Sequence, residues 1–158
     1  MPASYPTSVK SFTTKVNGVD APDAEHINDL QLEVAAVETD LLKAPTDYSG
    51  IATIVGWTTY TSKVLTYLKI GKLVLVQYYI SGTSNSATTT VTLPYAIATG
   101  LDQFGVGYAV DNGGTPVVAR IQVTGSTLYL SPSMSTGWTV WTASGTKTAR
   151  GHFFYFTS

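Results

Sequence analysis

The chain has 158 residues, of which 44% are hydrophobic and only 12% are charged, and its formal net charge is −1. It contains no cysteine, which excludes a disulfide framework, a thiol nucleophile and a cysteine-based zinc site. No apolar run approaches the roughly 18 residues of a membrane-spanning helix, and the first ten residues lack the apolar segment of a secretory signal. Because 25 threonines, 14 serines and 14 glycines make up a third of the sequence, we expect a β protein.

The charged residues divide the chain near residue 50. Residues 1–49 hold eight acidic residues and three lysines, whereas residues 50–158 hold six basic residues and two acidic ones. The balance therefore changes from −5 to +4, which indicates two parts of different character. The basic residues neither cluster nor follow a known motif, so we expect no nucleic-acid partner.

The first 19 residues are polar and have no helical periodicity. Their apolar side chains Val9, Phe12 and Val16 are too sparse to form a core. We therefore expect residues 1–19 to form an extended arm held against another surface. The alternative is a disordered tail, which is common at chain ends.

Residues 20–44 carry the local signals of a helix. Asp20 is a suitable N-cap, Pro22 is tolerated in the first turn, and Pro45 ends the segment. Acidic residues gather near the start and Lys43 lies near the end, as the helix dipole favours.

The apolar residues of this segment recur at alternating spacings of three and four: Ile27, Leu30, Val34, Val37 and Leu41. This is the heptad pattern of a coiled coil, although it does not decide the number of helices. The flanking positions are polar, so the stripe is narrower than that of a helix packed on its own domain. We expect a self-associating coil; a single amphipathic helix docked on the β domain is the alternative. A coil this short is marginal by itself, so a second contact must hold the copies together.

From residue 51 onward the hydrophobic period changes to two, and turn-forming glycines and asparagines separate the segments. The expected strands are 52–60, 64–70, 72–81, 87–93, 103–111, 116–124, 127–132, 138–142 and 147–157. Short strands in this number, with no helical window between them, predict an antiparallel, jelly-roll-like β-sandwich knob at residues 45–158.

Two of these strands do not alternate in hydrophobicity. Residues 72–80 read KLVLVQYYI and residues 151–156 read GHFFYF. One face of each strand should line the core, and the other must also be covered. Either long loops of the same chain cover it, or it lies in a subunit interface that supplies the contact the coil lacks.

Several segments resemble bacteriophage virion appendage proteins, the short fibres of head or tail that begin with an attachment segment and a brief trimeric coil. The resemblance is best over residues 16–94 and is carried by Val16–Asp20, Ala24–Val34, Tyr67–Val74, Ile80–Ser86 and Leu93–Pro94. It implies a homotrimer on the virion surface, with a C-terminal knob and an N-terminal arm. Val9, Phe12 and Val16 of that arm would anchor the chain to a phage capsid or tail protein.

No combination of residues predicts catalysis, a metal site or a cofactor. His152 is the only histidine after residue 50 and lies in an aromatic strand, so a serine nucleophile has no evident base. Asp102 and Asp111 are the only carboxyl side chains after residue 50, too few to favour glycan cleavage. His26 could form a ring in a trimeric coil, but it flanks the seam and is expected to face solvent. We expect a protein that is not an enzyme.

The aromatic residues are more numerous than most cores of this size need, and a tyrosine or tryptophan offers an apolar face with a polar handle. Trp138 and Trp141 are the candidate contacts for a host-surface glycan; packing across the sheet is the alternative reading of the aromatics. We therefore expect a non-enzymatic trimeric head fibre or decoration protein. A receptor-binding tip of a tail fibre is the second hypothesis, and a glycan depolymerase is the third.

Overall fold

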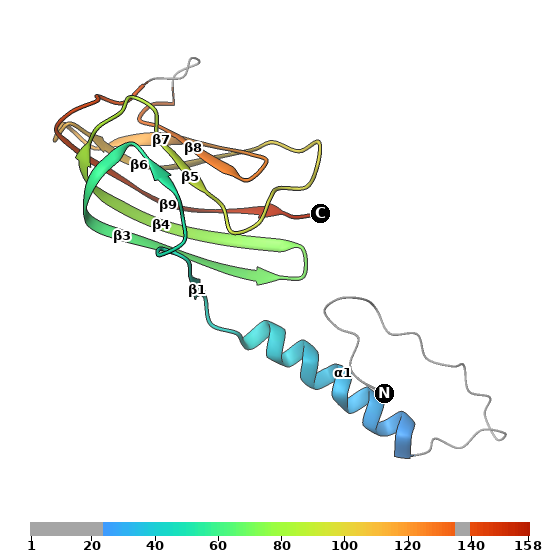
Figure 1. Cartoon of the computed structure of the whole chain (residues 1–158). Helices are drawn as coiled ribbons and strands as arrows, with labels where there is room; N and C mark the ends of the chain where they lie inside the picture. Colours follow the sequence, from blue (N-terminus) through green and yellow to red (C-terminus); the bar gives the residue numbers. More distant parts are fainter. Residues whose placement is uncertain (1–23, 135–139) are drawn as a thin grey trace. The chain divides into compact units, whose positions relative to one another are not determined.

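The structure, a computed structural model, describes residues 24–134 and 140–158 (Figure 1). The chain divides between Ala44 and Pro45 into an N-terminal unit and a β unit. The expected arm at 1–19, with Val9, Phe12 and Val16, lies outside the described residues, as does Trp138. In the described ranges, no helix has the length and apolar character needed to cross a membrane.

Residues 24–44, the described part of the N-terminal unit, contain the helix α1 (Ala24–Leu42). Near its end, Lys43 forms an ion pair with Asp40, and Pro45 follows shortly afterwards. The heptad residues Ile27, Leu30, Val34 and Leu41 keep about half of their surface exposed, between 50% and 56%. Val37 is half-buried. The seam of α1 is therefore open to contact with other copies of the chain, and the coiled coil stays a prediction.

The β unit consists of β1 (Thr46–Asp47), β2 (Ile54–Val55), β3 (Trp57–Ile70), β4 (Leu73–Ser84), β5 (Thr90–Thr92), β6 (Gln103–Asp111), β7 (Val117–Thr124), β8 (Thr127–Ser131) and β9 (Thr146–Phe156). They form one antiparallel sheet in the order β1-β3-β4-β9-β6-β7-β8-β5-β2. Gly56 alone separates β2 from β3, although the two strands lie near opposite ends of this order, so the sheet curls back on itself (Figure 1). The expectation of a mainly β, antiparallel fold is confirmed.

Several strand boundaries differ from the expected ones: β4 ends at Ser84 rather than at residue 81, and β5 covers only Thr90–Thr92 of the expected 87–93. The segments expected at 52–60 and 64–70 are largely one long strand, β3, because irregular pairing with β4 near Tyr60 and Ser62 carries the strand through a polar stretch. At this irregularity the backbones approach so closely that a Cβ on Gly82 would lie 1.9 Å from the carbonyl oxygen of Thr59. The prediction of a strand at 138–142 is wrong for residues 140–142, the described part of that segment, which have irregular backbone. The short strand β1 was not predicted.

The inner face of the curled sheet forms the core. Along β4 and β9, the two strands without hydrophobic alternation, burial nevertheless alternates. The buried side chains are Val74, Val76, Tyr78 and Ile80 on β4, and Ala149, Phe153 and Tyr155 on β9. The intervening residues point to the outer face, and many of these are also apolar. No loop of the described chain buries them fully, so the expectation that long loops cover both strands does not hold for these residues.

A lysine closes the curl at the place where the ends of the sheet meet. Lys147 on β9 is fully buried, and its Nζ donates hydrogen bonds to the carbonyl oxygens of Gly56 (3.1 Å) and Ser86 (2.9 Å) and to Oγ1 of Thr89 (3.0 Å). The ammonium also lies 5.0 Å and 5.1 Å from the ring centroids of Trp57 and Trp141. One side chain thus joins β9 to the β2–β3 junction and to the segment before β5.

Candidate interaction surface

The outer face of the β unit is organised in rows that cross several strands. Strand pairing places Leu68 of β3, Leu75 of β4 and Phe154 of β9 side by side in one row. A second row, two residues along each strand, contains Thr66, Gln77 and His152. A third row contains Val64, Tyr79, Arg150, Tyr108 and Val118, from β3, β4, β9, β6 and β7. Side chains in such rows are neighbours and present one continuous surface.

The first part of this surface is an apolar patch, defined by Leu68, Ile70, Leu73, Leu75, Phe154 and Phe156. Leu75, Phe154 and Phe156 keep 40%, 49% and 50% of their surface exposed, and the other three are half-buried. The rings of Phe154 and Phe156 meet edge to face with centroids 6.5 Å apart. A contiguous set of exposed leucine and phenylalanine side chains is typical of an interaction surface rather than of a free one.

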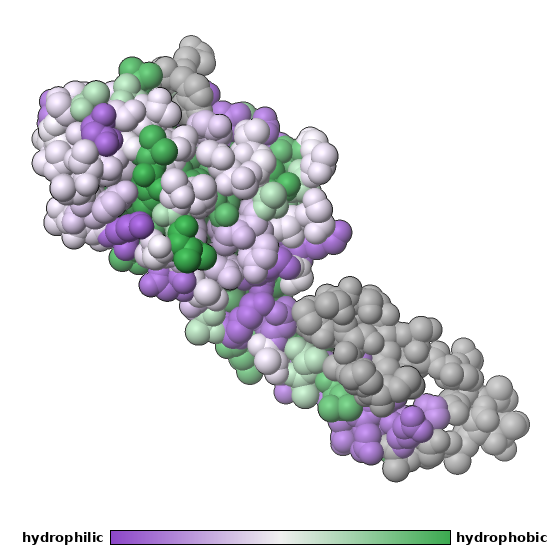
Figure 2. Space-filling model, viewed as in Figure 1, coloured by the Kyte–Doolittle hydropathy of each residue, from purple (hydrophilic) through white to green (hydrophobic). Residues whose placement is uncertain are grey.

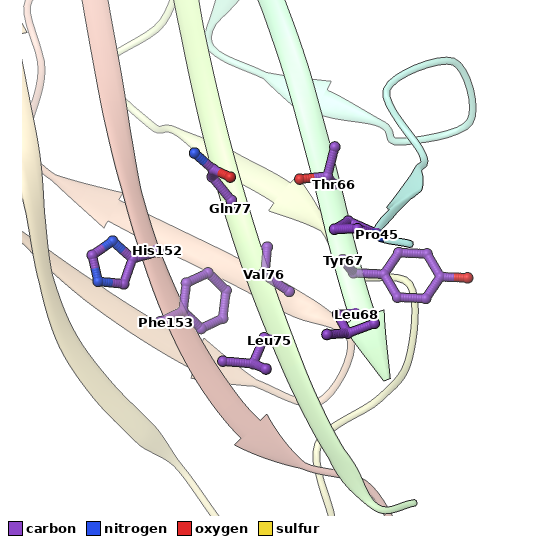
Figure 3. Close-up of a pocket in the computed structure, with 9 residues that line it drawn as sticks. All are labelled: Pro45, Thr66, Tyr67, Leu68, Leu75, Val76, Gln77, His152 and Phe153. Carbon is purple, nitrogen blue, oxygen red and sulfur yellow. The ribbon is translucent and has the colours of Figure 1, made fainter. Parts of the chain in front are cut away.

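The apolar patch borders the point at which the chain enters the β unit. Pro45, the first residue of this unit, lines a hollow of about 250 Å³ together with residues of β3, β4 and β9. Figure 3 shows this hollow, with Leu68 and Leu75 of the apolar patch among its walls. Strand β1 follows directly and pairs with Thr66 and Tyr67 of β3. The patch and the start of the β unit are therefore adjacent.

The second part of the surface is an aromatic and cationic depression of about 600 Å³. Its lining residues come from β4, β9, β6 and β7: Gln77, Tyr78, Tyr79, Val106, Gly107, Tyr108, Val118, Arg150, Gly151 and His152. The guanidinium carbon of Arg150 lies 4.0 Å from the ring centroid of Tyr108. On the face seen in Figure 2, hydrophobic residues of the β unit lie among near-neutral ones, with few strongly hydrophilic residues.

The candidate glycan contact at Trp141 is wrong. The residue is 2% exposed, its indole N–H donates to the carbonyl oxygen of Leu130 at 2.9 Å, and its ring faces the ammonium of Lys147. A buried ammonium is stabilised by aromatic faces, and this role removes the ring from the surface. The partner residue of the pair, Trp138, lies outside the described residues, so its role stays a prediction.

The carboxylates of Asp102 and Asp111, the candidate pair for glycan cleavage, take part in local hydrogen bonds. Asp111 accepts from the backbone N–H of Thr142 (2.9 Å and 3.1 Å to its two oxygens) and from its hydroxyl (2.9 Å). Asp102 accepts from the hydroxyl of Thr124 at 3.0 Å. Within the described ranges, no three histidine, aspartate or glutamate residues gather as metal ligands would. That the protein is not an enzyme stays a prediction.

The sequence analysis did not single out two residues of β9: Lys147, which is buried, and Arg150, which lines the depression. The alternation of β9 nevertheless carried a signal for both. In an extended strand, residues of equal parity share a face. Lys147 has the parity of Phe153 and Tyr155 and is buried with them, whereas Arg150 has the parity of Phe154 and Phe156 and lies outside. No local pattern could indicate that Trp57 and Trp141 flank Lys147, or that Tyr108 lies against Arg150. Both contacts depend on strand order.

Comparisons of the chain with protein-family models, with curated proteins and with solved structures find no match.

Proposed function

We propose that this chain is a non-enzymatic structural protein of a phage virion, a short homotrimeric head fibre or decoration protein. Residues 1–19 would anchor it to a capsid or tail protein, residues 20–44 would form the trimeric coil, and residues 45–158 would form an outward knob. The curled sheet, whose strands β3, β4 and β9 and strands β6, β7 and β8 form opposite sides of the core, suits the sandwich or jelly-roll form of such a knob.

The observation that carries the proposal is the succession of two exposed apolar surfaces along the chain. The first is the heptad seam of α1, and the second is the apolar patch beside Pro45. Only three residues separate Leu42, the last residue of α1, from the β unit's β1 at Thr46. Copies joined along α1 therefore bring the starts of their β units together, and the apolar patch is the surface that borders this start.

The size of the two surfaces suits this arrangement. Burying a leucine or phenylalanine completely is worth about 1.5–3 kcal/mol, so a half-exposed one gains about half of that. The three half-exposed residues Leu75, Phe154 and Phe156 then contribute about 2–4 kcal/mol per copy, the less exposed Leu68, Ile70 and Leu73 add less, and the cost of association is subtracted from this sum. Neither the short coil nor the patch is large enough alone, whereas together they support a stable oligomer.

We place the proposed chain on the virion head rather than on the tail. The resemblance of residues 16–94 to appendage proteins supports the virion itself. A receptor-binding tip of a tail fibre is the second candidate, favoured by the aromatic and cationic depression. The two assignments differ in where the chain sits on the particle.

The location on the particle tests the proposed function. Antibody labelling of purified phage particles should place the chain on the head, and deletion of residues 1–19 should leave a folded trimer that no longer joins particles. The apolar residues of the arm are sparse, so its loss should not change the number of copies that light scattering reports. Normal occupancy by the truncated chain would contradict the anchoring role, and labelling of the tail tip would favour the second candidate.

The apolar patch is tested by Phe154→Ser. Phe154 is 49% exposed and lies on the outer face, so the substitution should leave the fold of a single copy intact. In the trimer it removes one apolar contact per copy, and we expect dissociation at roughly tenfold higher protein concentration, equivalent to about 2.7 kcal/mol per trimer or about 0.9 kcal/mol per copy. Analytical ultracentrifugation over a dilution series measures this shift. Thr58→Ser, at an exposed position of β3 outside the patch, is the control. An unchanged dissociation curve would place the patch outside the interface.

A further inference from the structure

The aromatic and cationic depression exists because two neighbouring strands separate. Strand β9 pairs with β6 only from Lys147–Asp111 to Arg150–Tyr108. Beyond this last pair, β9 continues alongside β4 and β6 continues alongside β7. The outer face therefore opens next to Arg150 and Tyr108. Gly107 and Gly151 have no side chains to fill the opening. The ring of Tyr78 lies beneath both glycines, and the Tyr78 hydroxyl is within 3 Å of the position that a Cβ atom on either glycine would take.

The groups around this opening are arranged for one kind of ligand. Tyr79 and Tyr108 flank Arg150 in the same row, and Tyr79 is 43% exposed. The guanidinium lies against the face of Tyr108, which orients its planar set of N–H donors. Gln77 and His152, both exposed, supply further hydrogen-bonding groups in the next row.

The lining of the depression carries one formal charge, the guanidinium of Arg150. Its lining contains an arginine and a histidine and no aspartate or glutamate. A carboxylate entering it would meet the fork of donors with which arginine binds planar anions, and no acidic group of the lining would oppose it. An exposed tyrosine ring beside that fork offers a flat apolar face to the C–H groups of a sugar ring.

We propose that this depression binds a saccharide that carries a carboxylate, such as a uronic-acid residue of a surface polysaccharide. Arg150 binds the carboxylate, Tyr79 stacks on the sugar ring, and Gln77 and His152 bind its hydroxyl groups. Charged residues are few in this sequence, and the fold places one of them, Arg150, against the aromatic face of Tyr108. The biological source of the ligand rests on the proposed function, whereas its chemistry rests on the depression alone.

The experiment is a calorimetric titration of the purified full chain with oligogalacturonate and with a hyaluronan tetrasaccharide. A neutral galacto-oligosaccharide of equal length and inorganic phosphate are the comparison ligands. We expect one or both acidic saccharides to bind, and the neutral sugar and phosphate to bind at least about tenfold more weakly. Binding of the acidic saccharides should weaken as salt is added.

The variants Arg150→Met and Tyr79→Ala should each reduce the affinity, Arg150→Met by about tenfold or more. Both positions are exposed, so circular dichroism and thermal unfolding should change little. The matched control is Lys72→Met, which removes an exposed cation from the β3–β4 turn, outside the depression, and should leave the affinity within about twofold.

Three results would overturn the inference. Neither acidic saccharide binds; the neutral sugar or phosphate binds equally well; or Arg150→Met leaves the affinity unchanged. A smaller oligomer mass for Arg150→Met, without saccharide binding by the parent chain, would instead place the depression in a subunit contact. A monomeric mass of the chain, or its absence from phage particles, would contradict the proposed function. Neither result would affect the outcome of the saccharide titration, so the two failures can be distinguished.

Discussion

Lys147→Met is expected to lower the free energy of unfolding of the β unit by roughly 3 kcal/mol. Methionine keeps the length and the apolar stem of the side chain but removes all three donors. The carbonyl oxygens of Gly56 and Ser86 and the hydroxyl of Thr89 then lose a partner in a buried place. Two indole faces also lose the cation between them. Because these contacts join distant parts of the sheet, we expect the loss of stability to extend to the whole β unit.

Urea denaturation followed by tryptophan fluorescence measures this loss, since Trp57 and Trp141 flank the substituted side chain. Lys72→Met serves as the control, because Lys72 is exposed in the turn between β3 and β4 and should change stability by less than about 0.5 kcal/mol. A loss below about 1 kcal/mol for Lys147→Met would mean that the hydrogen bonds only offset the desolvation of the ammonium.

The pH dependence of stability gives a second measurement on the same residue. Burial lowers the pKa of Lys147 to about 8, while the charge of Asp111 partly opposes this shift. Between pH 8 and the ordinary lysine value the folded chain binds fewer protons than the unfolded chain, so the free energy of unfolding should rise with pH. We expect a rise of about 1–2 kcal/mol from pH 7.5 to 9.5, absent in Lys147→Met.

Above this window the trend should reverse. Burial raises the pKa of Tyr48, Tyr78 and Tyr155 well above the ordinary value of a tyrosine. The unfolded chain then releases protons that the folded chain retains, so stability falls as the pH increases beyond about 10. A maximum between pH 8 and 10 is therefore the expected profile, and a monotonic fall from pH 7 would contradict the shift of Lys147.

Val34→Asp is expected to convert the trimer to monomers at micromolar concentration while the β unit stays folded. Val34 occupies the middle of the heptad seam and is 50% exposed on a single α1. In a trimeric coil, three carboxylates would meet on one axis, where desolvation and mutual repulsion cost several kcal/mol. The β unit is a separate compact unit, so its thermal unfolding should persist.

Thr39→Asp is the matched control for the coil. Thr39 is an exposed position of α1 outside the seam, five residues from Val34, so the new carboxylate stays in solvent. Light scattering coupled to size exclusion should report trimer for Thr39→Asp and monomer for Val34→Asp. Equal masses for the two variants would mean that α1 does not hold the copies together as a coiled coil. A single amphipathic helix docked on the β domain would then be the better interpretation.

Local sequence patterns were sufficient to predict the helix and those strands whose formation depends on residues nearby in the chain. The helix signals of residues 20–44 agree with α1 at Ala24–Leu42, and β6 occupies the expected 103–111. Both follow from periodicity and from breakers such as Pro45, which act within a few residues. The mainly β, antiparallel character was readable for the same reason.

Tertiary structure alone decided what the aromatic and charged side chains do. The sequence left open whether Trp141 contacts a glycan or packs in the core, and the curl of the sheet brings it to the ammonium of Lys147 from β9. Arg150 became part of a depression because β9 and β6 separate beyond its pairing with Tyr108. Such placements depend on strand order and register over long separations in sequence, and the free energy that selects them comes from packing of the whole sheet rather than from any local segment.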